Sequence, residues 1–219
     1  MPRAVMLADM AATPLAMGVT LAAVQVFGAS TTLAGAQQQF AEGLRADYTL
    51  TAPSAAGISP EVVEAVWETP GVAVVTPVGR SQALLTFPSE DSTATRVFAA
   101  QGVTPDRLPE TIDLAVTQGD IAELRGETVA LSRIAAETVR GTVGETIELR
   151  LGDGHLRNPR VVAIYENGLG FGDVTLPNDL VVAHTTAQVN SAVLVSAVGL
   201  WRGVVALPGS RRWRMGIDP

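Results

Sequence analysis

Apolar residues run without a charge through the beginning of the chain, and the remainder alternates polar and apolar positions in short segments. The 32 residues from Met10 to Ala41 contain no Asp, Glu, Lys or Arg. A bilayer has a hydrocarbon core about 30 Å thick, which takes about 20 apolar residues as a helix. A helix is expected because lipid cannot bond exposed backbone groups. The sequence therefore predicts a transmembrane helix from Ala11 to Leu33.

Two other interpretations of this segment remain open. One is a buried helix of a soluble domain. The other is a cleaved secretory signal, since Arg3 precedes the apolar run and Ala-Gly-Ala at 34–36 fits a cleavage site. The run is longer than the apolar region of a signal peptide, about 7–15 residues, which favours the transmembrane helix. Gly18 and Ala22, one turn apart, indicate close packing against other transmembrane helices.

Residues after the apolar run predict short helices between strands. Ser59-Pro60-Glu61 is typical of a helix start, and Pro70-Gly71 of its end. Ser132 is expected to cap a second helix that runs to Arg140 and ends at Gly141. A third helix is expected near Asn178–His184. In the first helix the expected buried side chains are Val63, Val66 and Trp67.

Strands are predicted wherever β-branched and apolar residues alternate with polar ones. Gly152-Asp153-Gly154 lies between two such segments and predicts a hairpin. Helices and strands intermix without a βαβ rhythm, which favours an α+β fold with a largely antiparallel sheet. The expected strands are Arg45–Pro53, Val72–Thr76, Arg80–Phe87, Thr95–Gln101, Glu127–Leu131, Glu145–Leu151, Arg160–Tyr165 and Ala192–Ser196.

Charge divides the chain into three parts and argues against nucleic acid as a partner. Residues 42–197 hold 20 acidic side chains and 10 arginines, a net charge of −10 that would repel phosphate backbones. The last part reverses the sign, with four arginines against Asp218. We therefore divide the chain into a transmembrane part (1–41), an extracytoplasmic domain (42–197) and an irregular basic tail (198–219).

The chain contains neither lysine nor cysteine, and this excludes several chemistries. All 15 basic residues are arginine. A P-loop lysine, a Schiff-base lysine, a thiolate nucleophile and a zinc–sulfur site are therefore impossible. A Gly-x-Ser-x-Gly nucleophile motif is also missing from the sequence.

The remaining candidate motifs predict no catalytic, cofactor or metal site. The glycine-rich loop at 168–172 is followed by Asp173 and strand formers rather than by a helix, so we expect a tight or mobile connection and not a phosphate cradle. His155 is expected beside the hairpin turn and His184 at a helix end, each next to ordinary surface residues, so we do not expect the two to bind a metal. Glu61, Glu64 and Glu68 lie one turn apart, as on a solvated helix face.

Several segments together resemble one family. The sequence RADYTL at 45–50 follows the apolar helix, and SPEVVEAV at 59–66 leads to PGV at 70–72. TVALS at 128–132 precedes VGETIEL at 143–149, and RVVAIYE at 160–166 precedes GLGFGD at 168–173. Over about residues 5–197, these segments resemble the extracytoplasmic domain of FtsX/MacB-type ABC transporter permeases.

The resemblance implies a non-catalytic permease subunit in the cell membrane, with the domain after residue 41 outside the cytoplasm. Its implied partners are a cytoplasmic ATP-binding cassette ATPase, membrane lipid, and the remaining permease helices or a second permease copy. No cofactor is implied. Permeases of this type have further transmembrane helices after the outer domain, and this sequence shows none, so we expect a truncated permease.

Two other functions stay open at this stage. One is a free-standing binding module, anchored or secreted. The other is an extracytoplasmic enzyme that works through paired carboxylates, although no residue pattern selects such a pair.

Overall fold

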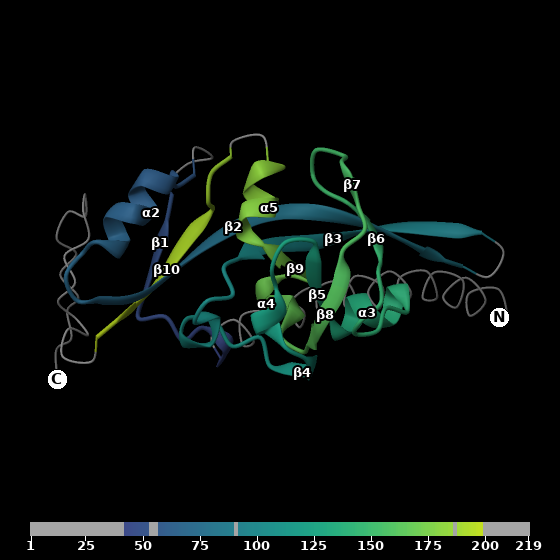
Figure 1. Ribbon diagram of the computed structural model, residues 1–219, viewed down its shortest axis with the longest axis horizontal. Helices are drawn as coiled ribbons and strands as arrows, with labels where there is room; N and C mark the ends of the chain where they lie inside the picture. The colour runs from purple at the N-terminus through teal and green to yellow at the C-terminus, as the bar shows by residue number, and fades with distance from the viewer. Residues whose placement is uncertain (1–41, 53–56, 90–91, 186–187, 199–219) are drawn as a thin grey trace, which may run out of the picture.

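The computed structural model describes residues 42–52, 57–89, 92–185 and 188–198, which form an extended mixed sheet with short helices (Figure 1). Both the predicted transmembrane helix and all of the basic tail beyond Val198 lie outside the described residues. Among the described residues, no helix has the length and apolar character needed to span a bilayer.

The described residues form ten strands of one sheet, in the order β1-β10-β2-β3-β9-β5-β8-β4, with β6 paired to β2 and β7 to β6. Most neighbours are antiparallel, as expected, but β3 with β9 and β5 with β8 are parallel. The strands are β1 (Tyr48–Thr51), β2 (Val72–Pro88), β3 (Thr93–Val103), β4 (Val116–Gly119), β5 (Thr128–Ser132), β6 (Glu148–Arg150), β7 (Leu156–Arg157), β8 (Arg160–Tyr165), β9 (Val174–Pro177) and β10 (Ala192–Ala197).

Within the part of the chain that the structure describes, four short α-helices and two 3-10 turns connect these strands. Figure 1 shows α2 and α5 near β2 and β10, and α3 and α4 near β5 and β8. The helices are α2 (Pro60–Trp67), α3 (Arg133–Val139), α4 (Gly168–Phe171) and α5 (Asn178–Ala183), and the 3-10 turns are Leu108–Glu110 and Ile121–Glu123.

One strand prediction is wrong in an informative way. The segments predicted as Val72–Thr76 and Arg80–Phe87 form one 17-residue strand, β2, because the sequence between them stays extended and pairs with both β10 and β3. The hairpin predicted at the Gly-Asp-Gly turn is confirmed: β6 pairs with the short strand β7, and Thr146 bridges Arg160, the first residue of β8, in the same antiparallel register. β8 then continues between β5 and β4.

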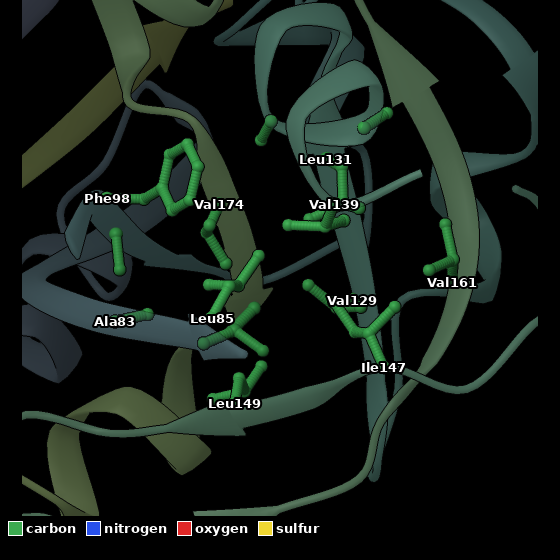
Figure 2. Close-up of a cluster of buried hydrophobic side chains, with 14 of the residues drawn as sticks. Ala83, Leu85, Phe98, Val129, Leu131, Val139, Ile147, Leu149, Val161 and Val174 are labelled. Carbon is green, nitrogen blue, oxygen red and sulfur yellow. The ribbon is translucent and has the colours of Figure 1, made fainter. Parts of the chain in front are cut away.

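The largest apolar core lies where β2, β3, β5, β6, β8 and β9 meet α3 (Figure 2). Every residue of β5 is buried, and the side chains of Leu85, Val129 and Leu131 are fully inaccessible. Strands buried on both faces are rich in apolar residues, as β5 and β9 are, and the buried Thr175 within β9 is hydrogen-bonded to Gln101 and Tyr165. Packing in this core holds together the central strands of the sheet, and the helices lie against these strands.

Candidate functional site

A cavity with a volume of about 620 Å³ lies between α2 and α5. We call it the α2–α5 pocket. Its lining is mostly apolar. The residues that line it include Pro60, Val63, Glu64, Trp67, Val75, Val103, Asp106, Leu124, Arg125, Asn178, Asp179 and Val182.

Helix α2 forms one wall of this pocket, with one face packed on the sheet and another facing the pocket. Val66 is fully buried against the sheet. The positions spaced three and four residues apart, Pro60, Val63, Glu64 and Trp67, face the pocket. Trp67 is 56% exposed, so the prediction that it is buried is wrong: its ring borders a cavity rather than the core.

Helix α2 starts at the predicted residues, but without the expected side-chain cap. Ser59 has the extended backbone of an N-cap residue, and Pro60 occupies the first turn. The Ser59 hydroxyl makes no capping bond to the helix backbone. It bonds the Glu61 carboxylate instead, and this hydrogen bond is the main reason that the pKa of Glu61 is lowered.

Helix α5 forms the opposite wall and is held by its first residue. The Asn178 side chain accepts from the Gly79 backbone N–H at 2.9 Å and donates to the Asn190 side chain at 2.9 Å. A Cβ at Gly102 would lie 2.7 Å from the Cβ of Val181, so this glycine lets α5 approach β3 closely. The position of this wall is therefore determined by the contacts of α5 with the sheet and with Asn190, and not by the helix alone.

Acidic side chains surround the pocket. Asp106 pairs with Arg125, their atoms 2.5 Å apart. Glu64 and Asp179 are exposed and form no ion pair within the described residues. Of the three glutamates considered from sequence, only Glu64 lines the cavity; Glu61 and Glu68 lie outside it.

The two histidines, which lie 29 residues apart in the sequence, share one carboxylate. Asp153, in the turn before β7, contacts Nδ1 of His155 at 2.8 Å and Nδ1 of His184 at 2.6 Å through the same oxygen. The candidate ligand atoms of these three residues lie within 4.8 Å of one another. Sequence spacing gave no signal for this cluster, because His184 follows α5 and reaches the turn only through the fold.

Hydrogen bonding explains this cluster without a bound ion. Desolvation raises the pKa of Asp153, but bonds from the His184 ring and from the His155 backbone and ring outweigh it and lower that pKa to about 2. Arg157 lies 3.1 Å from Nε2 of His184 and is a donor only, so that nitrogen accepts and Nδ1–H faces Asp153. The positive guanidinium beside His184 also opposes a cation. The cluster joins the β6–β7 turn to the end of α5.

The glycine-rich loop is tightly turned, one of the two alternatives expected. Gly168–Phe171 forms a single helical turn, and Gly172 has a positive φ of 105°. A Cβ at Gly168 would lie 2.5 Å from the Cβ of Ser132. The Ser132 hydroxyl donates to Asp173 at 2.7 Å and accepts from the Ala135 backbone N–H, which confirms it as the cap of α3. The C-cap of α3 is Arg140, in the left-handed region, and not Gly141.

The strands by which the chain enters and leaves the domain lie side by side. β1 and β10 are antiparallel neighbours, with Tyr48 opposite Val195 and Thr51 opposite Ala192. The Asp47 side chain accepts from the Ala197 backbone N–H at 2.9 Å. The first residue of β1 and the last residues of β10 therefore share one end of the sheet (Figure 1).

Comparison with known proteins identifies the fold. The model of the MacB-like periplasmic core domain matches residues 15–203. The periplasmic region of MacB from Actinobacillus actinomycetemcomitans is similar, with a TM-score of 0.52 and 12% identity over 69% of this chain and 73% of that one. The extracellular domain of the noncanonical ABC-type transporter YknZ from Gram-positive bacteria gives 0.50 and 14%, over 70% and 84%. No curated protein matches the chain by sequence.

The match covers most of the chain, and the mixed sheet with few short helices agrees with it. The resemblance inferred from the segments at 45–50, 59–72, 128–149 and 160–173 is therefore confirmed. The chain belongs to the MacB-like periplasmic core domain family, the extracytoplasmic domain of ABC transporter permeases.

Proposed function

We propose that this chain is a non-catalytic permease subunit, or part of one, of an FtsX/MacB-like ABC transporter. Its outer domain couples ATPase-driven helix motion to the handling of a substrate or partner outside the membrane. The cytoplasmic ATPase supplies the energy. The apolar segment within residues 1–41 sits in membrane lipid beside the remaining permease helices or a second permease copy.

The adjacency of β1 and β10 is the observation that carries this proposal. A helix preceding residue 42 pulls on β1, and any element following residue 198 pulls on β10. Because β10 also pairs with β2 along Ala192–Ala197, displacement of either connection reaches the longest strand directly. Hydrogen-bonded strands resist relative sliding, since a shift by one residue turns every side chain to the other face. The sheet is thus suited to transmit movement as a rigid element.

The absence of cysteine makes a clean experiment possible. Ser92, exposed beside the β2–β3 turn, is replaced in the Ser92→Cys variant, and the chain is expressed in membranes with its cytoplasmic ATPase. We expect a membrane-impermeant maleimide to label this cysteine from outside. We further expect the distance between spin labels on two permease copies to change with ATP and vanadate.

The control is an ATPase that binds ATP without hydrolysing it and so cannot be trapped by vanadate. Labelling from the cytoplasmic side only would contradict the proposed location. A spin-label distance that stays the same with and without nucleotide would contradict the coupling.

A further inference from the structure

We propose that His184 is a pH-sensitive link between α5 and β7: at neutral pH its ring joins Asp153 to Arg157, and its protonation releases Arg157 while Asp153 stays bound. Histidine side chains ordinarily gain a proton between about pH 5 and 8. The domain belongs to a periplasmic family, so this link meets the pH of the surroundings rather than that of the cytoplasm. The inference does not depend on an ATPase, so it and the coupling function can fail separately.

At neutral pH both ring nitrogens of His184 have partners from the β6–β7 segment. Nδ1–H donates to the Asp153 carboxylate at 2.6 Å, and Nε2 accepts from the Arg157 guanidinium at 3.1 Å. Because arginine is a donor only, this arrangement requires that Nε2 carries no proton. The side chain of His184 is only 14% exposed, so water has little access to replace either partner.

The charged and titratable groups around His184, within the described residues, come from the β6–β7 turn, from β7 and from the residue before β5. They are Asp153, His155, Arg157 and Glu127. On α5 itself the charged residue is Asp179, in the first turn, at the opposite end from His184. β2 approaches the turn at Gly152 with uncharged groups, the Ser81 hydroxyl and the Gln82 carbonyl. Among all these groups, the guanidinium is the one that contacts Nε2.

A proton on Nε2 turns this contact from attraction into repulsion. The ring then presents an N–H to an N–H of Arg157, with positive charge on both sides and no acceptor between them. Arg157 also donates to Glu127 at 3.0 Å, so it keeps one carboxylate when it leaves the ring. Its Nε is buried without a hydrogen-bond partner in the described structure, and leaving lets that N–H reach water. The proton therefore breaks the bond to Arg157.

The contact with Asp153 responds to the same proton in the opposite way. Desolvation raises the pKa of Asp153, but hydrogen bonds from His184 and His155 outweigh it and lower that pKa to about 2. The carboxylate thus stays ionised over the whole range in which histidines gain a proton. A hydrogen bond from an imidazolium to a carboxylate is charge-assisted and stronger than one from a neutral ring. In acid α5 therefore keeps the turn and loses β7.

Loss of the bond to His184 frees a strand that has few other contacts. β7 consists of Leu156 and Arg157 and pairs with β6. Leu156 is 44% exposed, so the strand buries little apolar surface of its own. After protonation, Glu127 is the remaining side-chain partner of Arg157 in the described chain. We therefore expect β7 to move relative to α5 in acid.

Two spin labels measure this movement in the full chain, which has no cysteine of its own. Leu156→Cys on β7 and Ala183→Cys at the end of α5 replace exposed residues, so each accepts a label. We expect a narrow distribution of label distances at about pH 8 and loss of that narrow population at about pH 5. Nitrogen-15 NMR of the two histidines reports their protonation directly, and the loss should follow the protonation of His184.

Variants show which group senses the proton. His184→Asn and Arg157→Met each remove one partner of the pH-sensitive bond, so both should give a broad distribution that is the same at both pH values. His155→Asn is the matched control. The His155 side chain is 67% exposed and contacts Asp153 from within the same turn, so its proton leaves β7 in place and the pH response should remain. Circular dichroism should show the same secondary structure in every variant.

Several results would overturn the proposal. A distribution that stays narrow in acid in the parent chain would show that protonation does not release β7. A pH response that survives in His184→Asn or in Arg157→Met would place the sensor elsewhere, and a response lost in His155→Asn would assign it to His155. Broadening accompanied by loss of the circular dichroism signal would indicate acid unfolding of the domain rather than release of one strand.

Discussion

The sheet body, consisting of β5, β8 and β9, and its outer end, consisting of α2, β1 and β10, are built in different ways. In the body, β5 and β9 are buried along their whole length. At the outer end β1 alternates half-buried and exposed residues, and α2 buries only Val66. The body is held by packing on both faces. At the outer end β10 is buried throughout as well, whereas β1 and α2 beside it bury only one face, and α2 leaves Trp67 beside a cavity. A fixed body continued by β10, with less buried elements at the chain connections, suits a domain that transmits movement.

The largest difference in stability between the two regions is expected when one leucine in each region is replaced by alanine. Leu131 of β5 is fully buried, and Leu131→Ala should lower the free energy of unfolding by about 2–5 kcal/mol, because it removes packing and leaves a cavity. Leu50 of β1 is only partly buried, so Leu50→Ala should cost less than half as much. Urea unfolding followed by circular dichroism measures both. Equal losses would mean that the two regions do not differ in packing.

The helix caps give a second and smaller contrast. Ser132→Ala removes the hydroxyl that caps α3 and bonds Asp173, and should cost about 0.5–2 kcal/mol. Ser59→Ala removes a hydroxyl that caps nothing and should cost under about 0.5 kcal/mol. The same unfolding measurement compares them. A larger loss for Ser59→Ala would contradict the assigned hydrogen bonds.

Acid should weaken the cluster that joins the β6–β7 turn to α5. The pKa of Asp153 is lowered in the fold, from 3.8 to about 2. A group with a depressed pKa stabilises the fold above its unfolded pKa and loses this contribution as the pH falls through its folded pKa. Asp153→Asn should therefore be less stable than the parent chain at pH 5, and the difference should shrink from about pH 4 towards pH 2. Urea unfolding across this pH range measures the difference in stability between the variant and the parent chain. A difference that does not change with pH would contradict this prediction.

The smallest expected effect is that of Trp67→Ala on stability. Since the side chain is 56% exposed, its removal should change the free energy of unfolding by no more than about 0.5 kcal/mol. Urea unfolding followed by circular dichroism measures this change. A large loss of stability would mean that Trp67 supports the outer end rather than the pocket.

Local signals predicted much of the fold. The cap at Ser132, the helix at Asn178–Ala183 and the last strand at Ala192–Ala197 depend on residues near one another in the chain. Strand pairing was less predictable. The hairpin at the Gly-Asp-Gly turn was predicted, but the pairing of β8 with β5 and β4 was not, because it depends on which buried faces meet in the complete sheet.

Neither the pocket nor the histidine cluster could be predicted from the sequence, and the reason is the same for both. Trp67 reads as a buried residue because its helix spacing matches that of Val63, and only the position of α5 shows that this face borders a cavity. His155 and His184 come together only because α5 is fixed by Asn178 and Gly102 beside β2 and β3. Such long-range contacts leave no periodic signal along the chain.

A reversible cross-link between β1 and β10 tests the central claim most directly. Thr51→Cys and Ala192→Cys place cysteines on directly opposed residues of the two strands in a chain that otherwise has none. A third substitution, Ser92→Cys, carries a spin label. The label is attached while the cysteines introduced at positions 51 and 192 are joined as a disulfide. The account predicts that the ATP-dependent change in label distance persists with the disulfide intact, because the two strands move as one. Loss of that change on oxidation, with recovery on reduction, would show that the strands must separate and would contradict the account.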